Sequence, residues 1–105
     1  MVIRKLAEEL MVRVYYPISA IVSLDENGKC LAVRMFDTMF AKTYLAIHRD
    51  AAQVYLLSNH PEGYEEPYPQ DLENYAELNR IAAGIQIRFA ITGEDVGYRE
   101  IDLPA

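Results

Sequence analysis

The stretch best suited to chemistry is Ser58-Asn59-His60-Pro61-Glu62-Gly63, which residues 64–71 follow. Ser58 and His60 belong to the segment Ser-Asn-His-Pro, which follows an apolar run over residues 54–57 that is typical of a buried strand. Polar side chains at the end of a buried strand can converge on a cleft. Asp71 lies near the start of the helix that is predicted next. An imidazole and a carboxylate placed in this way are the first candidates for a site.

This segment resembles the JAB/MPN/JAMM metalloisopeptidase family, and its RadC branch in particular. That family carries His-x-His-Pro after a strand, and Ser-x-x-Asp begins the following helix. Here His60-Pro61 matches the second His with its proline, and Asp71 falls at the family's Asp. Gly63 and Pro67 also stand where RadC-like sequences carry Gly and Pro. The resemblance covers residues 18–71. In that family the two His and the Asp bind zinc.

Three functional positions of the family have changed in this chain. Ser58 stands at the first His, and Tyr68 stands at the Ser that helps to hold the oxyanion. The upstream Glu, which activates the zinc-bound water, aligns with Arg34 through Leu24-Asp25 and Met35-Phe36. The resemblance therefore implies a degenerate site.

These changes predict that the site is not catalytic. A catalytic zinc site has three protein ligands and an open position for water, whereas His60 and Asp71 supply two at most. Ser58 is a poor zinc ligand, and no carboxylate is left to take a proton from water. We therefore expect a vestigial His60–Asp71 pair, no cofactor and no enzymatic activity. Asp71 is also interpreted as a helix cap, because Pro69 and Asp71 suit a helix start.

The preferred functional hypothesis is a catalytically inactive MPN/JAB-like module that binds a protein partner. The predicted binding residues surround the former active site: Ser58, Asn59, His60, Tyr64 and Tyr68. Tyrosines on a proline-stiffened loop, here residues 58–69, bury much area at little entropic cost. Another interpretation is that Tyr68 simply fills the space that the metal has left.

Two other functions stay open at this point. One is a zinc-dependent isopeptidase or peptidase with an atypical site, which needs a third metal ligand from His48, Glu62 or water. The other is a small acidic inhibitor from a phage or mobile element, which would cover a basic surface of its target.

Composition narrows the classes of partner. The net charge is −6, from 16 acidic and 10 basic residues, so generic nucleic-acid binding is not expected. The acidic surface suits a basic protein partner, or serves only solubility. No apolar run approaches the roughly 20 residues of a membrane span. A single cysteine, Cys30, and the lack of a signal-peptide pattern at residues 2–6 predict a cytoplasmic protein.

The elements that must position the site suggest one α/β domain over residues 1–105. We predict a mixed sheet flanked by helices, with the MPN/JAB-like layering that is also seen in the cytidine-deaminase type of fold. Hydrophobic periodicity predicts helices over residues 2–12, 40–51 and 70–83, and strands over 18–24, 29–36, 53–57, 85–92 and 96–103. Asn27-Gly28 predicts a tight turn between the first two strands.

Periodicity also assigns faces to two of these elements. The third helix is expected to bury Leu72, Tyr75, Leu78 and Ala82. The strand over residues 85–92 is expected to turn its odd-numbered positions inward and its even-numbered positions outward.

Overall fold

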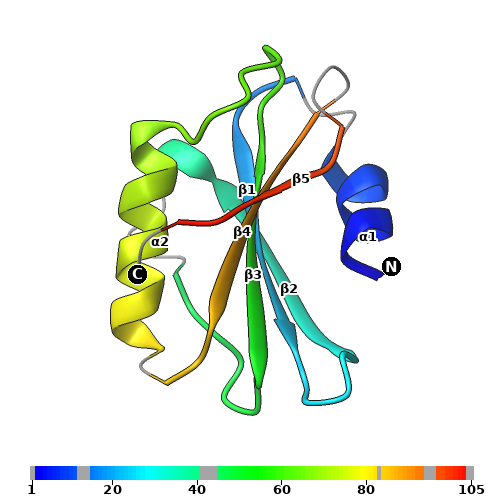
Figure 1. The fold of residues 1–105 in the computed structure, drawn as a ribbon, viewed down its shortest axis with the longest axis vertical. Coiled ribbons are helices and arrows are strands. Elements are labelled where there is room, and N and C mark those ends of the chain that lie inside the picture. Colours follow the sequence, from blue (N-terminus) through cyan, green and yellow to red (C-terminus); the bar gives the residue numbers. More distant parts are fainter. Residues whose placement is uncertain (1, 12–14, 41–44, 83, 94–96, 104–105) are drawn as a thin grey trace.

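A five-stranded mixed sheet forms the centre of the molecule, and one helix packs on each of its faces (Figure 1). The structure is a computed structural model that describes residues 2–11, 15–40, 45–82, 84–93 and 97–103. In chain order the elements are α1 (Val2–Met11), β1 (Ile18–Leu24), β2 (Cys30–Asp37), the 3-10 turn η1 (Thr38–Phe40), β3 (Gln53–Asn59), α2 (Pro69–Ile81), β4 (Ile87–Thr92) and β5 (Arg99–Ile101). The expected α/β class is confirmed, with a mixed sheet and helices on both sides.

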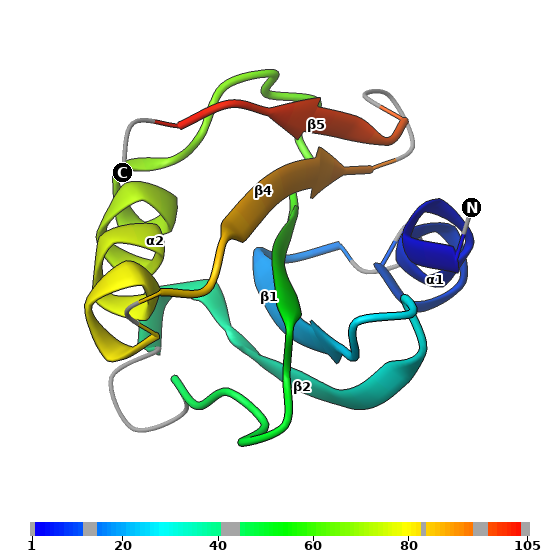
Figure 2. The same ribbon diagram turned by 60° about the horizontal axis from the view of Figure 1, so that its bottom comes forward.

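The strands are arranged in the order β2-β1-β3-β4-β5. β1 is antiparallel to both β2 and β3, β3 is parallel to β4, and β4 is antiparallel to β5. Parallel neighbours need a crossover connection, and α2 with its flanking loops provides it. The hairpin and β3 therefore share one sheet, and α2 begins close to the end of β3 (Figures 1 and 2).

Both faces of the central strands β1, β3 and β4 are buried, and strand alternation divides the core in two. Val54 and Leu56 of β3 face α2, whereas Tyr55 and Leu57 face α1. The α2-side cluster includes Ile21, Phe36, Tyr75, Leu78, Phe89 and Ile91, and the α1-side cluster includes Ile3, Ala7, Ala20, Val22 and Ala90. Burial on both faces explains why β3 is continuously apolar in the sequence.

The predicted β1–β2 turn is confirmed, and Asp25 organises it. The Asp25 carboxylate accepts hydrogen bonds from the backbone N–H groups of Asn27 (2.9 Å) and Lys29 (2.8 Å). Gly28 takes a φ of 82°, the left-handed conformation that glycine adopts without steric cost. Together these features fix the hairpin register.

The predicted helix over residues 40–51 is wrong for the described residues 45–51, which contain no helix. Residues 41–44 lie outside the described part of the chain. The segment is instead bonded to the end of β1: the His48 N–H donates to Ser23 Oγ (3.2 Å), and the Ala52 N–H donates to the Leu24 carbonyl (2.8 Å). Leu45 and Ile47 still pack against the α2-side core. Tertiary contacts therefore override the helical periodicity.

Two predicted faces are also corrected. Leu72 is 46% exposed, while Asp71 and Asn74 are buried on the inner side of α2, so the buried stripe is rotated and partly polar. Ala90 and Thr92 of β4, expected to face solvent, are buried on the α1 side of the sheet. Amphipathic alternation fails there because a second helix covers that face.

Strand boundaries shift in ways that matter for the site. β3 extends to Asn59, so Ser58 and Asn59 lie in the strand and not in the loop. β5 is shorter than expected, and residue 96 of that prediction lies outside the described residues. None of the described helices is long and apolar enough to cross a membrane.

Candidate functional site

Buried polar side chains gather where β3 ends, β1 begins and α2 starts. Those with almost no exposure are Ser19, Thr38, Ser58, Asn59, His60, Asp71, Asn74 and Thr92. In α/β sheets, ligands bind beyond the carboxyl ends of the parallel strands, and β3 and β4 end here. The chain thus places its own polar groups at the position that such folds use for binding.

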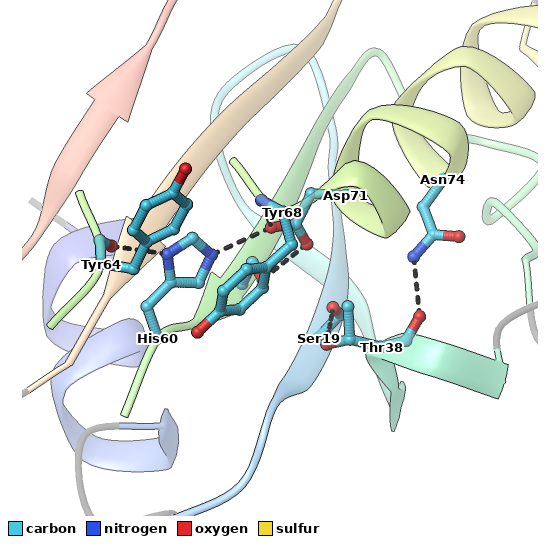
Figure 3. Close-up of polar contacts among 8 residues, drawn as sticks. Ser19, Thr38, His60, Tyr64, Tyr68, Asp71 and Asn74 are labelled. Atoms are coloured by element: carbon cyan, nitrogen blue, oxygen red, sulfur yellow. Dashed lines mark hydrogen bonds and ion pairs between the residues drawn. The ribbon is translucent and has the colours of Figure 1, made fainter. Parts of the chain in front are cut away.

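Ser58, His60 and Asp71 form a hydrogen-bonded network, called here the buried network. Figure 3 shows the contact between His60 and Asp71. His60 Nε2 lies 2.9 Å from Asp71 Oδ2, and Ser58 Oγ donates to Asp71 Oδ1 at 2.7 Å. The Tyr68 backbone N–H donates to Asp71 Oδ2 at 2.9 Å. The His60 and Asp71 side chains are fully buried. Two donors and the His60 ring nitrogen therefore surround one carboxyl group that water does not reach.

The other ring nitrogen of His60 is also occupied. Nδ1 lies 2.7 Å from the Tyr64 carbonyl oxygen, which can only accept a hydrogen bond. An N–H at Nδ1 satisfies that bond, and Nε2 makes the contact with Asp71 Oδ2 at 2.9 Å. Both ring nitrogens of His60 are therefore occupied within the protein.

Asp71 also caps α2, which confirms the interpretation of this residue as a helix cap. It accepts the N–H of Tyr68, the residue before the helix, and its own N–H donates to the Tyr68 carbonyl at 2.9 Å. Pro69 occupies the first helical position, where its missing N–H costs nothing. A carboxylate in the first turn also interacts favourably with the helix dipole. One side chain thus joins the helix start to the end of β3.

Two tyrosine rings lie over His60. The Tyr68 ring centroid is 4.1 Å from that of His60, and the Tyr64 ring is nearly parallel to Tyr68 at 5.6 Å (Figure 3). Burial raises the pKa of the Tyr68 hydroxyl most, and the negative charge of Glu62 raises it further. Tyr68 is partly buried, whereas Tyr64 is 46% exposed. The rings therefore separate the buried network from solvent and offer an aromatic surface.

A second set of buried polar contacts supports α2 from the other side. Ser19 Oγ and Thr38 Oγ1 are 2.7 Å apart, and Asn74 Nδ2 donates to the Thr38 carbonyl at 3.2 Å (Figure 3). Sequence reasoning missed Asn74. A signal was present, because Asn74 follows Asp71 by three positions and shares its helix face.

Gly93 holds the backbone of His60 against β4. The His60 N–H donates to the Thr92 carbonyl at 2.8 Å, and a Cβ atom on Gly93 would lie 2.8 Å from the His60 carbonyl oxygen. Only glycine leaves room for this approach. Nothing in the sequence pattern pointed to this role, because the contact joins two separate loops.

The structure brings the predicted binding residues together but does not expose them all. Ser58, Asn59 and His60 are completely buried, so the expectation that they surround an open cleft is corrected. The physical reason is that β3 continues to Asn59, so that its end is enclosed. Tyr64 and Tyr68 alone among the five reach the surface.

Two further residues considered for a metal site lie elsewhere. Arg34 is exposed on the edge strand β2, opposite Ile21, and β1 separates it from Ser58. His48 bonds to Ser23, which lies at the opposite end of β1 from the strand position that pairs with Ser58. Its Nδ1 accepts the Asp50 N–H at 3.1 Å. His48 therefore cannot supply a third ligand beside His60.

The residues present do not fit a catalytic zinc ion. The two candidate ligand atoms, His60 Nε2 and Asp71 Oδ2, bond to each other, and the Ser58 hydroxyl donates its proton to the same carboxylate. Zinc prefers deprotonated N, O or S ligands, and a neutral hydroxyl is not among its usual ones. Across the described ranges, no group of three His, Cys, Asp or Glu side chains is arranged to hold a metal.

A scan against protein-family models finds no matching family, and a search of the curated proteins finds no significant match. The resemblance to the JAB/MPN/JAMM family therefore stays a prediction. It depends on the spacing of His60, Pro61 and Asp71 in the sequence.

Proposed function

We propose that this chain is a non-catalytic, MPN/JAB-like domain that binds a protein partner through Tyr64 and Tyr68. The observation that carries the proposal is the different exposure of the polar groups and of the tyrosines around His60. The polar groups at the expected catalytic positions bond to one another inside the protein, while the tyrosines above them face outward. Rigid, partly exposed aromatic side chains are effective interface anchors.

The surroundings of the tyrosines support a preformed surface. The Tyr64 carbonyl is bonded to His60, and the Tyr68 N–H is bonded to Asp71, so the backbone of both residues is anchored to the buried network. Pro67 and Pro69 restrict the same loop. Binding of a partner here would therefore cost little conformational entropy, because the loop is already ordered.

A nucleophilic enzyme is a poorer fit to this geometry. In a Ser-His-Asp triad the histidine lies between the other two residues and takes the proton from the serine. Here Asp71 lies between Ser58 and His60, and all three are buried. The zinc-dependent isopeptidase remains an alternative that metal analysis can test. The acidic inhibitor remains a variant of the binding proposal, distinguished by strong salt dependence.

The test is affinity capture with matched surface variants. Tyr64→Ala removes one exposed ring without touching the carbonyl that bonds His60. Ile81→Ala, at the far end of α2, removes a similarly exposed apolar side chain (44% against 46%) and serves as the control. We expect a defined partner to be captured by the wild-type protein and by Ile81→Ala, and to be lost with Tyr64→Ala. Equal capture by both variants would refute the proposed surface.

A further inference from the structure

The tyrosine pair lines a shallow hollow in the surface, called here the tyrosine hollow. Its walls are Glu62, Gly63, Tyr64, Tyr68 and Pro69, and its volume is about 520 Å³. Sites for small groups fall in the range of roughly 300–1,000 Å³, so one large side chain of a partner can enter. The chemistry of the walls then indicates which side chain fits.

The aromatic part of the wall offers π faces. Tyr64 and Tyr68 are tilted by only 9° relative to each other, with their centroids 5.6 Å apart, so they form a nearly parallel pair. The faces of tyrosine rings carry negative electrostatic potential and attract cations within about 6 Å. Parallel rings also offer a flat surface to a planar group.

The charged part of the wall is acidic. Glu62 lies close enough to Tyr68 to raise the pKa of its hydroxyl, after the larger effect of burial, and Glu62 makes no ion pair with any described residue. The Tyr64 hydroxyl donates a hydrogen bond to Glu66 Oε2 at 3.3 Å. The neighbouring Glu65 is already paired with Arg99 at 3.4 Å. Within the described part of the chain, no cation therefore offsets the negative charge of Glu62 at the hollow.

Arginine side chains already stack on tyrosine rings at two other places in this chain. The guanidinium carbon of Arg4 lies 5.1 Å from the Tyr98 ring centroid, and that of Arg88 lies 5.8 Å from the Tyr55 ring centroid. A guanidinium is planar, stacks on aromatic faces and pairs with carboxylates through directed N–H groups. Tyr64, Tyr68 and Glu62 provide both kinds of partner within one hollow.

We propose that the tyrosine hollow receives an arginine side chain of the protein partner, stacked on the tyrosines and paired with Glu62. This inference rests on the proposed function, and it names the chemistry that the binding surface recognises. It also gives the acidic surface a specific role at one place, beyond solubility.

The experiment uses a blocked Gly-Arg-Gly tripeptide as the probe and its citrulline counterpart, which has the same shape without the charge. Binding to the full chain is followed by NMR chemical shifts. We expect the arginine peptide to shift Tyr64, Tyr68 and Glu62, and the citrulline peptide to shift them far less. Glu62→Gln should weaken binding about twofold to fivefold, as should Tyr64→Ala, because each removes one exposed contact. Glu73→Gln, an exposed change on α2, should leave binding unchanged.

The inference would be overturned by equal shifts with the citrulline peptide, by shifts spread over the acidic surface, or by binding that is unchanged in Glu62→Gln. A lysine peptide that binds more tightly than the arginine peptide would also count against it, because the planar group would then be irrelevant. The proposed function is tested separately, by the capture experiment with Tyr64→Ala and Ile81→Ala. If capture of the partner depends on Tyr64 but not on Glu62, the binding surface stands and the arginine assignment falls.

Discussion

His60 Nε2 lies 2.9 Å from Asp71 Oδ2, and both side chains are completely buried. This contact joins the residue that follows β3 to the first turn of α2, so it sets the helix against the sheet. A buried ionisable pair contributes little when compared with apolar residues, but removing one partner is costly. The pair therefore fixes the position of α2 against the sheet, and its disruption should lower the stability of the fold measurably.

We expect Asp71→Asn to lower the free energy of unfolding by about 2–4 kcal/mol, because the amide keeps the shape but cannot reproduce all three contacts of the carboxyl group. Urea unfolding followed by circular dichroism measures the loss. Asp50→Asn makes the same chemical change at an exposed position and should stay within about 0.5 kcal/mol of the wild type. Equal stability of the two variants would show that the buried network does not support the fold.

Gly93→Ala should destabilise the protein by about 1–3 kcal/mol, because the new methyl group would overlap the His60 carbonyl. The φ of Gly93 is not positive, so backbone strain adds nothing to this cost. Hydrogen exchange at the His60 N–H, which donates to Thr92, should accelerate in the variant. Unchanged stability and unchanged exchange would mean that His60 can move away from β4 freely.

Tyr98 should make the protein sensitive to alkali. Burial raises the pKa of Tyr98, the negative charge of Glu100 raises it further, and the result is about 12. The Tyr98 hydroxyl is also buried without a hydrogen-bond partner among the described residues. In the unfolded chain tyrosine loses its proton near pH 10. Between about pH 10 and 12 the unfolded state therefore binds fewer protons than the folded state, and stability falls as the pH rises.

The corresponding variant is Tyr98→Phe, which should match the wild type at pH 7 and retain more stability above pH 10. Two pKa units correspond to about 2.7 kcal/mol, and solvent screening at this half-buried ring reduces the expected difference to about 1 kcal/mol. Tyr15→Phe, at a tyrosine that is 79% exposed, is the control and should show no such gain. Parallel pH profiles for all three proteins would contradict the assignment.

Local sequence signals were sufficient for the elements that carry regular patterns. Ile18–Leu24 is a strand with the predicted boundaries, and Asn27-Gly28 turns the chain where expected. The helix expected over residues 40–51 failed in its described part, because hydrogen bonds from His48 and Ala52 to the end of β1 decide its path. Periodicity carries no information about such long-range bonds.

The resemblance to the JAB/MPN/JAMM family pointed to Ser58, His60 and Asp71 as positions of one former metal site, and the structure brings these three side chains into direct contact. Their burial could not be read from the sequence, because it depends on β3 extending to Asn59 and on Tyr68 covering His60. The close approach of Gly93 to His60 likewise depends on how two loops meet in space.

The most direct test of the account is zinc binding by the purified chain, because a buried network that satisfies its own bonds leaves no ligand for a metal. Elemental analysis and calorimetric titration with zinc should give far less than one zinc per chain, and zinc should leave the melting temperature unchanged. One tightly bound zinc per chain, lost in His60→Ala, would contradict the account.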